Sequence, residues 1–446
     1  IPHPVYETTL ATIVPKAMGA AEIADTIAGF AAAARRARAA GFDAVEIHAA
    51  HGYLISQFHT PAENRRTDAY GGSLENRARF GLEVLRAVKA AAPDAAVVYR
   101  ISVEDFFAAG MPWREGREIA VWAAAAGADA LHVTAGHYRS LPSAAMMIPP
   151  MALPEGVFLD YAAGVKAAVA VPVIAVGRLG DPARASAAVA ARKADFIALG
   201  RTLIADPDWV EKLRRGEPAR RCLACNTCVD EMRGGAALGC VVNGAAGRER
   251  QFLAATPPKG ERIAVIGAGP AGLTYASLAT EGNDVTVFER AGIAGGAFRL
   301  AGKALLFQEV EAREDSFARY IDAMVAACRG RGVVFRYGVD VQRAPEMLAP
   351  FDRLVIAVGA KYRWGLGLPL AALLGCGAGR WPGLRRLMAS QRLRDWVYYR
   401  ARASRGDEFQ ALARPGQVLT VIGDARRAGK SKEAIASAFE AALGVQ

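Results

Sequence analysis

Five short apolar runs, each followed by a turn and a helical pattern, constrain the fold of this 446-residue chain more than any other feature. They lie between Ala21 and about Asp206. The runs end at His48, Ile101, Thr134, Val176 and Gly200. Short apolar runs that alternate with Ala- and Arg-rich helical patterns are typical of βα units on a parallel sheet. The sequence therefore predicts an α/β fold with polar residues at the carboxyl ends of its strands, where a (β/α)₈ barrel keeps its active site.

Five βα units are too few to close an eight-stranded barrel, because closure fixes strand number, tilt and shear together. We interpret the region as the last five βα units of a TIM (β/α)₈ barrel, with three units missing before it. The first residues, IPHPVYETTL, contain no initiating Met and neither the basic nor the apolar segment of a signal peptide. We therefore expect that the chain is truncated at its N-terminus.

A second domain is predicted from residues 262–290, which have the pattern of strand, glycine-rich turn, helix and strand. The turn is GAGPAG, in which Gly267, Gly269 and Gly272 hold the positions that let a backbone approach a pyrophosphate. Glu289 ends the second strand, where a carboxylate suits a ribose hydroxyl, and Arg290 follows it. This pattern indicates a Rossmann-like FAD/NAD(P)-binding domain, and we expect FAD or ADP as its ligand.

Further residues extend the predicted nucleotide site. Gly295 and Gly296 lie in the loop after the second strand, where a backbone can also approach the pyrophosphate, and Asp424 in VIGDA is placed to meet the ribityl chain of a flavin. The apolar runs FDRLVIAVGA and VLTVIGDA are expected to add strands to the same sheet. Between them, residues from about 361 to 414 are expected to form a helical insert, because they show no sheet periodicity.

Four of the six cysteines fall within nineteen residues. They are Cys222, Cys225, Cys228 and Cys240. Soft thiolates at such short spacings can wrap one [4Fe-4S] cluster from a single loop, and we favour this interpretation because flavin-type motifs flank the segment. A zinc site and a set of reduced structural cysteines are the alternatives. The clustering indicates a reducing compartment, and Cys328 and Cys376 are interpreted as core residues.

The segment GFDAVEIHAAHGYLISQF carries His48, His51 and Tyr53 at and just beyond the end of the first apolar run. Two imidazoles three residues apart can donate two hydrogen bonds to one carbonyl or carboxylate oxygen, and a nearby phenol can deliver a proton. A lone histidine is more often a hydrogen-bonded structural residue, but the position at a barrel strand end favours catalysis. His137, in VTAGHYRSLPS, is a further candidate for the same pocket.

Arginine and glycine at other strand ends predict contacts with a flavin. Arg100 ends the run VVYRIS, where a buried guanidinium needs an anionic partner. The edge of an FMN isoalloxazine, which becomes negative on reduction, is one such partner, and an internal carboxylate is the alternative. The last two runs end in VGR and LGR, and such pairs are typical of the phosphate site at the final loops of this barrel. The residues are Gly177 with Arg178 and Gly200 with Arg201.

The formal charge of +11 arises from 55 Lys and Arg against 44 Asp and Glu. We interpret it as arginines scattered over many helices, with attraction of an acidic partner or a phosphorylated substrate as the alternative. No basic run of the nucleic-acid type stands out. The sequence also contains no stretch of 18 or more uninterrupted apolar residues, the length needed to span a bilayer. We therefore expect a cytoplasmic protein with neither nucleic acid nor membrane among its partners.

These motifs together resemble the Old Yellow Enzyme superfamily, in its long iron-sulfur branch, which includes 2,4-dienoyl-CoA reductase, enoate reductases and trimethylamine dehydrogenase. The stretch HAAHGYLISQF followed by NRRTDAYGGSLENRARF is the most specific part, and the similarity covers nearly the whole chain. The resemblance implies that His48 and His51 grip the activating group of a substrate and that Tyr53 is the proton donor. It also implies cluster ligation by the four cysteines and an FAD or ADP site at GAGPAG with Glu289. The implied FMN contacts are Arg100, Arg178, Gly200 and Arg201.

The resemblance divides the chain into three parts. Residues 1–220 are the C-terminal part of an FMN-binding barrel, residues 221–255 hold the cluster loop and a linker, and residues 256–446 are the nucleotide-binding domain. The dienoyl-CoA reductases carry an NADPH domain where this chain has only about sixty residues, between Ala360 and Thr420. NADH or NADPH is therefore expected only as an external reductant.

The predicted function is that of an FMN-dependent, ene-reductase-like oxidoreductase that acts on an unsaturated carbonyl or acyl-CoA substrate. Two alternatives stay open. The cysteine spacing is closer to that of the amine dehydrogenases, which implies oxidation of trimethylamine or dimethylamine with electron transfer to an external flavoprotein or ferredoxin. The other alternative is a non-catalytic, truncated FAD-binding fragment. We favour the reductase because the amine dehydrogenases have Tyr where this chain has His48.

Overall fold

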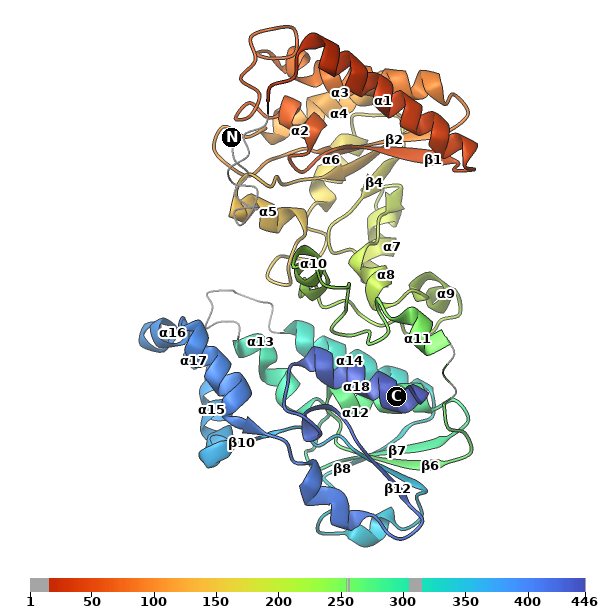
Figure 1. Cartoon of the computed structure of the whole chain (residues 1–446), viewed down its shortest axis with the longest axis vertical. Helices are drawn as coiled ribbons and strands as arrows, with labels where there is room; N and C mark the ends of the chain where they lie inside the picture. Colours follow the sequence, from red (N-terminus) through yellow and green to blue (C-terminus); the bar gives the residue numbers. More distant parts are fainter. Residues whose placement is uncertain (1–15, 254, 256, 305–314, 446) are drawn as a thin grey trace. The chain divides into compact units, whose positions relative to one another are not determined.

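The computed structural model describes residues 16–253, 255, 257–304 and 315–445 and contains two compact units (Figure 1). The first unit is Ile1–Leu199 and the second is Gly200–Gln446. In the part of the chain that is described, no helix combines the length and the apolar content needed to cross a lipid bilayer.

All five apolar runs of the first unit form strands, as predicted. The strands are β1 (Ala44–Ala49), β2 (Ala96–Ser102), β3 (Ala130–Thr134), β4 (Val173–Ala175) and β5 (Phe196–Ile197). They form one parallel sheet in the order β1-β2-β3-β4-β5. The helices of this unit are α1 (Ala20–Ala39), α2 (Leu54–His59), α3 (Leu74–Ala91), α4 (Trp113–Ala125), α5 (Leu141–Met147), α6 (Leu159–Lys166) and α7 (Pro182–Ala190). The prediction of an α/β fold with a parallel sheet is confirmed.

Side-chain caps set the start of the helices that follow β1 and β4. Ser73 Oγ accepts a hydrogen bond from the amide of Asn76 in the first turn of α3. Asp181 Oδ1 accepts one from the amide of Arg184 in α7, where Pro182 takes the first helical position. Such caps satisfy amides that a helix leaves free at its N-terminus. Each helix therefore begins where its loop supplies a capping oxygen.

One face of the first sheet is apolar and packed, whereas the other carries polar side chains. Successive strand residues point to opposite faces. The packed face includes Ile47, Tyr99, Ile101 and Val133, none of them more than 4% exposed. The opposite face, called the open face below, includes Glu46, His48, Arg100 and His132. Figure 1 shows α1, α3 and α4 along one side of β1 and β2.

The second unit contains the cysteine segment and a second parallel sheet. The short helices α8 (Arg201–Ala205), α9 (Trp209–Arg214), α10 (Thr227–Arg233) and α11 (Glu249–Leu253) precede the sheet. The strands are β6 (Arg262–Ile266), β7 (Asp284–Glu289), β8 (Val334–Tyr337), β9 (Arg353–Ile356) and β12 (Val418–Val421). Their order is β12-β9-β6-β7-β8, with every pair parallel. This is a doubly wound arrangement whose chain order reverses between β6 and β9, and the two runs expected to join the sheet do so.

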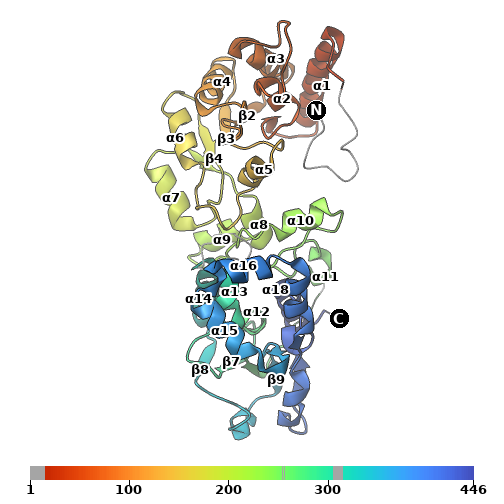
Figure 2. The ribbon, with the colours of Figure 1, turned by 90° about the vertical axis from the view of Figure 1, so that its left-hand side faces the viewer.

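Both faces of the second sheet are covered. Helices α12 (Pro270–Ala279), α14 (Asp315–Gly330) and α18 (Ser431–Leu443) lie along one face (Figures 1 and 2). On the other face, Leu348 of η4 (Pro345–Leu348) and Phe409 of η8 (Gly406–Leu412) join an apolar cluster with Ile356. A parallel strand buried on both faces has a continuous apolar sequence, as RIAVI of β6 does.

The insert between β9 and β12 is mainly helical, as expected, but it also contains a small strand pair. Its helical segments are η5 (Arg363–Gly365), α15 (Gly367–Gly375), η6 (Ala378–Arg380), α16 (Pro382–Met388), α17 (Gln391–Asp395) and the π-helical η7 (Trp396–Arg400). The strand β10 (Lys361–Tyr362) pairs antiparallel with β11 (Arg402–Ala403). Two-residue strands are too short to produce a period-two pattern, which is why no sheet periodicity marks them.

The basic residues are spread along the chain, as interpreted, but most of their excess over acidic residues lies in this insert. Residues 361–405 contain ten Lys and Arg but a single acidic residue, Asp395, so their net charge is +9 of the formal +11. Two of the arginines, Arg402 and Arg405, form ion pairs with Asp424 and Glu408.

Candidate active site

The three predicted catalytic side chains lie together at the carboxyl end of β1. His48 is in the strand, and His51 and Tyr53 follow in the loop before α2. The ring centroids of His48 and His51 are 5.2 Å apart, and those of His48 and Tyr53 are 5.0 Å apart. Tyr53 is 44% exposed, whereas His51 is buried. The structure thus brings together two imidazoles and one accessible phenol.

The loop that carries His51 is held by the ends of the next two strands. The backbone amide of His51 donates to Ser102 Oγ at 3.0 Å, and His51 Nε2 lies 3.1 Å from Thr134 Oγ1. Ser102 is the last residue of β2 and Thr134 the last of β3. His51 has a φ of 66°, in the left-handed region, and these contacts maintain that conformation. The ring of His51 is consequently fixed in one orientation.

A row of four polar side chains, called the polar row below, crosses the open face of the first sheet. It consists of Glu46, His48, Arg100 and His132. In the strand register, His48 pairs with Arg100 and Arg100 pairs with His132. Glu46 Oε2 is 2.8 Å from His132 Nδ1, and Glu46 Oε1 is 3.8 Å from Arg100 Nη1. Three buried nitrogens of the row, His48 Nδ1, Arg100 Nε and His132 Nε2, have no hydrogen-bond partner among the residues that the structure describes.

Burial and charge set the protonation of the site. Burial first, and the charge of Arg100 second, lower the pKa of His48 and hold the pKa of His51 well below its usual range. Burial lowers the pKa of Arg100, which Glu46 raises. For Glu46, burial is the strongest single influence and raises the pKa, but the hydrogen bond with His132 and nearby positive charges leave it lowered overall. At neutral pH the two catalytic imidazoles are therefore uncharged beside a guanidinium and a carboxylate.

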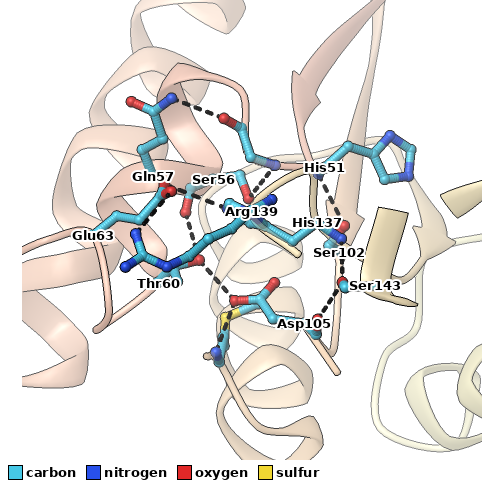
Figure 3. Close-up of polar contacts among 12 residues, drawn as sticks. His51, Ser56, Gln57, Thr60, Glu63, Ser102, Asp105, His137, Arg139 and Ser143 are labelled. Carbon is cyan, nitrogen blue, oxygen red and sulfur yellow. Dashed lines mark hydrogen bonds and ion pairs between the residues drawn. The ribbon is translucent and has the colours of Figure 1, made fainter. Parts of the chain in front are cut away.

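His137, the further candidate, is fully buried beneath the loop that carries His51 (Figure 3). A Cβ added to Gly52 would lie 2.6 Å from Cε1 of the His137 ring, so the ring packs directly against that loop. His137 Nε2 is 3.4 Å from Glu63 Oε2, and Arg139 Nη1 is 3.6 Å from Glu63 Oε1. His137 therefore packs against the loop that carries His51 and supports it.

Asp105 belongs to the same buried network, and no sequence motif marks it (Figure 3). Its Oδ2 accepts hydrogen bonds from Thr60 Oγ1 at 2.8 Å and from the amide of Met111 at 2.7 Å. Thr60 Oγ1 also lies 3.0 Å from the Ser56 carbonyl, and Ser56 Oγ accepts from the amide of Gly52. Burial raises the pKa of Asp105. The network connects the loop after β2 to the loop that carries His51 and Tyr53.

The two predicted phosphate-binding pairs belong to different units. Gly177 and Arg178 follow β4 in the first unit and have φ values of 108° and 56°, and Arg178 Nη1 donates to the Met151 carbonyl at 3.2 Å. Gly200 precedes α8 in the second unit, and the Arg201 guanidinium donates to Asn226 Oδ1 in the cysteine segment. Phosphate binding by these pairs stays a prediction.

The four clustered cysteines are free thiols that influence one another electrostatically. Burial raises the pKa of Cys222 and Cys228 and raises that of Cys240 to about 11, and the charges of neighbouring cysteines act in the same direction. The amide of Ala224 donates to Cys222 Sγ at 3.4 Å. Ala224 and Asn226 have left-handed φ values of 53° and 60°, so the loop between the cysteines is tightly wound.

Single-ion coordination finds no support in this segment. Within the described part of the chain, no group of three or more His, Cys, Asp or Glu side chains is arranged to hold a metal ion. A zinc site needs four donors around one ion, whereas each thiolate of a cubane cluster binds a different iron, so the cluster ligands lie farther apart. Cluster binding by the four cysteines stays a prediction.

The GAGPAG turn lies where the order of the second sheet reverses. Gly267 has a φ of 104°, and a Cβ there would lie 2.5 Å from the carbonyl oxygen of Ala357, just after β9. A Cβ at Gly272 would lie 2.0 Å from the Gly267 carbonyl oxygen. Gly269, which precedes the first residue of α12, has open space around it. Two glycines thus allow close packing, and the third leaves the helix N-terminus accessible to a phosphate.

The residues at the end of β7 and after it that are predicted to contact the nucleotide lie beside the GAGPAG turn or follow it in sequence. Glu289 accepts hydrogen bonds from the amides of Ala268 at 2.9 Å and Ala291 at 2.8 Å, and Arg290 after it is exposed. Gly295 donates to the Ala268 carbonyl at 2.8 Å. Gly296 then begins η2 (Gly296–Leu300), which leads into α13 (Ala301–Ala304). The backbone of the turn therefore meets the loop after β7. Nucleotide binding by these residues stays a prediction.

Asp424 lies in η9 (Gly423–Ala425), after β12. Its carboxylate accepts hydrogen bonds from the Arg402 guanidinium and, at 3.1 Å, from the amide of Gly429. Burial raises the pKa of Asp424, and the charge of Arg402 opposes that shift. Contact between Asp424 and a flavin stays a prediction.

Comparison with known proteins decides the family. Residues 2–220 match the NADH:flavin oxidoreductase / NADH oxidase family, and residues 265–301 match an NAD(P)-binding Rossmann-like domain. This chain belongs to the Old Yellow Enzyme superfamily. The first match includes His48, His51, Tyr53 and Arg100, and the second includes the GAGPAG turn and Glu289. The cysteine segment and Asp424 lie outside both matched ranges.

Three curated relatives from this superfamily differ in the reactions that their names state. The metal reductase of Desulforamulus reducens is 39% identical over 351 residues, which are 76% of this chain and 50% of the relative. The N,N-dimethylglycine/sarcosine dehydrogenase of Chromohalobacter salexigens is 37% identical over 68% of this chain and 44% of its own length. The cinnamate reductase of Clostridium sporogenes is 37% identical over 62% and 44%. The chain thus spans about half the length of the curated relatives it matches.

A solved structure of 2-naphthoyl-CoA reductase in complex with 2-naphthoyl-CoA is similar over nearly the whole chain. It aligns with a TM-score of 0.81 and 25% identity and covers 97% of this chain and 78% of that protein. Together with the long relatives, this likeness confirms the iron-sulfur branch of the Old Yellow Enzyme superfamily that the motifs indicate.

Proposed function

We propose that this chain is an FMN-dependent oxidoreductase of the ene-reductase type, which uses NADH or NADPH to reduce an unsaturated carbonyl or acyl-CoA substrate. The observation that carries the proposal is the convergence of His48, His51 and Tyr53 beside Arg100 on the open face of a parallel sheet. The names of two similar proteins, cinnamate reductase and 2-naphthoyl-CoA reductase, support a substrate with a conjugated carbonyl.

The open face fits a flavin. His48 Nδ1, Arg100 Nε and His132 Nε2 lie on three neighbouring strands, are buried, and lack partners among the described residues, so each can form a hydrogen bond with a polar ring edge. A half-buried guanidinium also favours a ring that gains negative charge on reduction. FMN held there would supply the hydride chemistry. Gly177 and Arg178 would contribute to its phosphate site.

The catalytic residues have distinct tasks in this proposal. His48 is neutral, so it would act on a substrate carbonyl as an uncharged hydrogen-bond donor. His51, whose ring centroid is 5.2 Å from that of His48, would donate to the same oxygen. The accessible phenol of Tyr53 would deliver a proton to the α-carbon. Burial of His51 and the support from Thr134 keep the donors fixed before the substrate arrives.

The cysteine segment and the glycine-rich turn provide two further cofactor sites. We propose that Cys222, Cys225, Cys228 and Cys240 bind a [4Fe-4S] cluster, which would supply one-electron transfer. The thiols are protonated at neutral pH where burial raises their pKa, so cluster assembly would release protons. The GAGPAG turn and Glu289 would bind FAD or ADP at the reversal point of the second sheet.

Anaerobic mixing of the purified full-length protein with NADH or NADPH, followed by cinnamate, tests the proposal. The flavin absorbance should bleach with the pyridine nucleotide and recover when cinnamate is added. A His48→Ala variant should still bleach but should recover far more slowly, because the substrate oxygen loses a donor.

Amine oxidation is the second candidate, and two observations favour it. The cysteine spacing is closer to that of the amine dehydrogenases, and a relative at 37% identity is named N,N-dimethylglycine/sarcosine dehydrogenase. In the same experiment, bleaching by N,N-dimethylglycine or trimethylamine, with none by either pyridine nucleotide, would replace the first proposal with this one.

A further inference from the structure

Within the polar row, Glu46 has no task in the proposed function, and His132 has one only through its Nε2 atom. Both interrupt apolar strands, in AVEIH and ALHVT, where an unpaired polar side chain is costly. The side chain of His132 is 7% exposed and that of Glu46 is 37% exposed. His132 is therefore buried, whereas Glu46 reaches it from an exposed position, and both lie on the same face as His48 and Arg100.

Glu46 divides its two carboxylate oxygens between two other strands. Oε2 is 2.8 Å from His132 Nδ1 on β3, and Oε1 is 3.8 Å from Arg100 Nη1 on β2. A carboxylate accepts and never donates, so His132 must carry its proton on Nδ1. On these two side chains, His132 Nε2 and Arg100 Nε are then buried nitrogens without a partner among the described residues. One carboxylate thus determines how two neighbouring side chains present their remaining polar atoms.

We propose that Glu46 is a positioning residue that orients Arg100 and His132 toward the flavin and limits the positive charge that the flavin meets. This inference rests on the proposed function, because it requires FMN on the open face. A merely structural ion pair would stabilise the sheet and leave the redox properties of a bound flavin unchanged.

The direction of the redox effect follows from charge. Glu46 is the carboxylate of the polar row and Arg100 its permanent cation, while burial keeps His48 and His51 neutral. Replacement of Glu46 by Gln would leave the Arg100 charge uncompensated. A reduced flavin that carries negative charge is then favoured over the oxidised flavin, so the midpoint potential should rise.

Flavin binding and potential in the full-length Glu46→Gln variant test the inference. We expect FMN binding weaker by about tenfold, as for supporting residues around other bound groups. We also expect about a tenfold greater preference for the reduced flavin, which corresponds to about 30 mV for a two-electron couple. Glu83→Gln is the matched control, because Glu83 lies on α3 and accepts a hydrogen bond from Tyr70, away from the polar row. It should change neither quantity.

The outcomes separate the inference from the proposed function. A wild-type protein that binds no FMN would overturn both. A wild-type protein that binds FMN, with a Glu46→Gln variant of unchanged affinity and potential, would overturn the positioning role alone. Should the variant fail to fold, ¹⁵N NMR of histidine in the wild-type chain decides instead: a proton on His132 Nδ1 is expected, and a neutral ring protonated only at Nε2 would contradict the inference.

Discussion

The two units contain the same element, a five-stranded parallel sheet, and leave different parts of it accessible. In the second unit the strand order β12-β9-β6-β7-β8 reverses between β6 and β9, and both faces are covered. In the first unit the strands follow chain order, and the open face carries the polar row. Because parallel sheets are normally buried on both faces, ionisable residues on one face are unexpected for a purely structural sheet. The two proposed ligand sites accordingly differ: one lies at the ends of the strands and the other over a face of the sheet.

The cysteine segment of the second unit provides the largest expected effect. Cys228→Ser should abolish the iron and sulfide of the purified protein, because a cubane cluster needs all four thiolates. Metal and acid-labile sulfide analysis measures this. Cys376→Ser is the control: the interpretation of Cys376 as a core residue is wrong, because it is exposed at the end of α15, and its loss should leave the iron content unchanged. Equal iron in both variants would remove the cluster from the account.

Removal of the Tyr53 hydroxyl should slow the reaction on the open face without disturbing the fold of the first unit. Tyr53→Phe keeps the ring contacts with His48 and Tyr138 but removes the proton donor. We expect flavin reoxidation by cinnamate to slow by about 10²- to 10⁴-fold, with bleaching by NADH unaffected. Stopped-flow absorbance resolves the two half-reactions. An equal loss in both would show that Tyr53 acts on the flavin site as a whole.

Close backbone packing at Gly272 should contribute to the stability of the second unit, whose sheet is covered on both faces. Gly272→Ala places a Cβ about 2.0 Å from the Gly267 carbonyl oxygen, so the second unit should lose about 3 kcal/mol of unfolding free energy. Gly269 lies in the same turn but has open space around it, so Gly269→Ala should cost less than about 1 kcal/mol of unfolding free energy. Urea unfolding compares the variants. Similar losses at both positions would mean that the turn does not pack as described.

Low pH should reduce the stability of the first unit more than that of the second, because all six histidines precede residue 138. Burial lowers the pKa of His59 to about 3, whereas an unfolded histidine titrates near 6.5. Between these values the unfolded chain binds more protons, so stability falls as the pH drops below about 6.5, by about 1.4 kcal/mol per pH unit for this residue. Hydrogen exchange between pH 7 and 5, resolved by unit, measures the difference. The trend should weaken in His59→Phe, and a steeper fall in the second unit would contradict it.

The strands and the glycine-rich turn are predictable because their signals are local. Each apolar run is flanked by turn residues, and GAGPAG stands between a strand and a helix. The charge of the insert is also local, and a count over residues 361–405 reveals what the whole-chain total hides. Local patterns cannot reveal β10 and β11, whose pairing joins segments about forty residues apart.

The polar row shows why part of the site escapes sequence reasoning. The spacing of Glu46 and His48 places them on one face, and that signal is present in the sequence. The register that aligns His48, Arg100 and His132 is a property of the folded sheet. Asp105 and Glu63 likewise gain their partners from loops distant in sequence, as Figure 3 shows. Interruptions of apolar runs by ionisable residues are the one pattern that would have marked Glu46 and His132.

Hydrogen exchange of the full-length protein with FMN or ADP added separately tests the central claim most directly. The account predicts that FMN protects segments 46–53, 100–105 and 132–137, at the ends of β1, β2 and β3, and leaves 267–296 unchanged. ADP should do the reverse. Protection of the glycine-rich turn by FMN, or no protection in the first unit, would contradict the assignment of the open face as the flavin site.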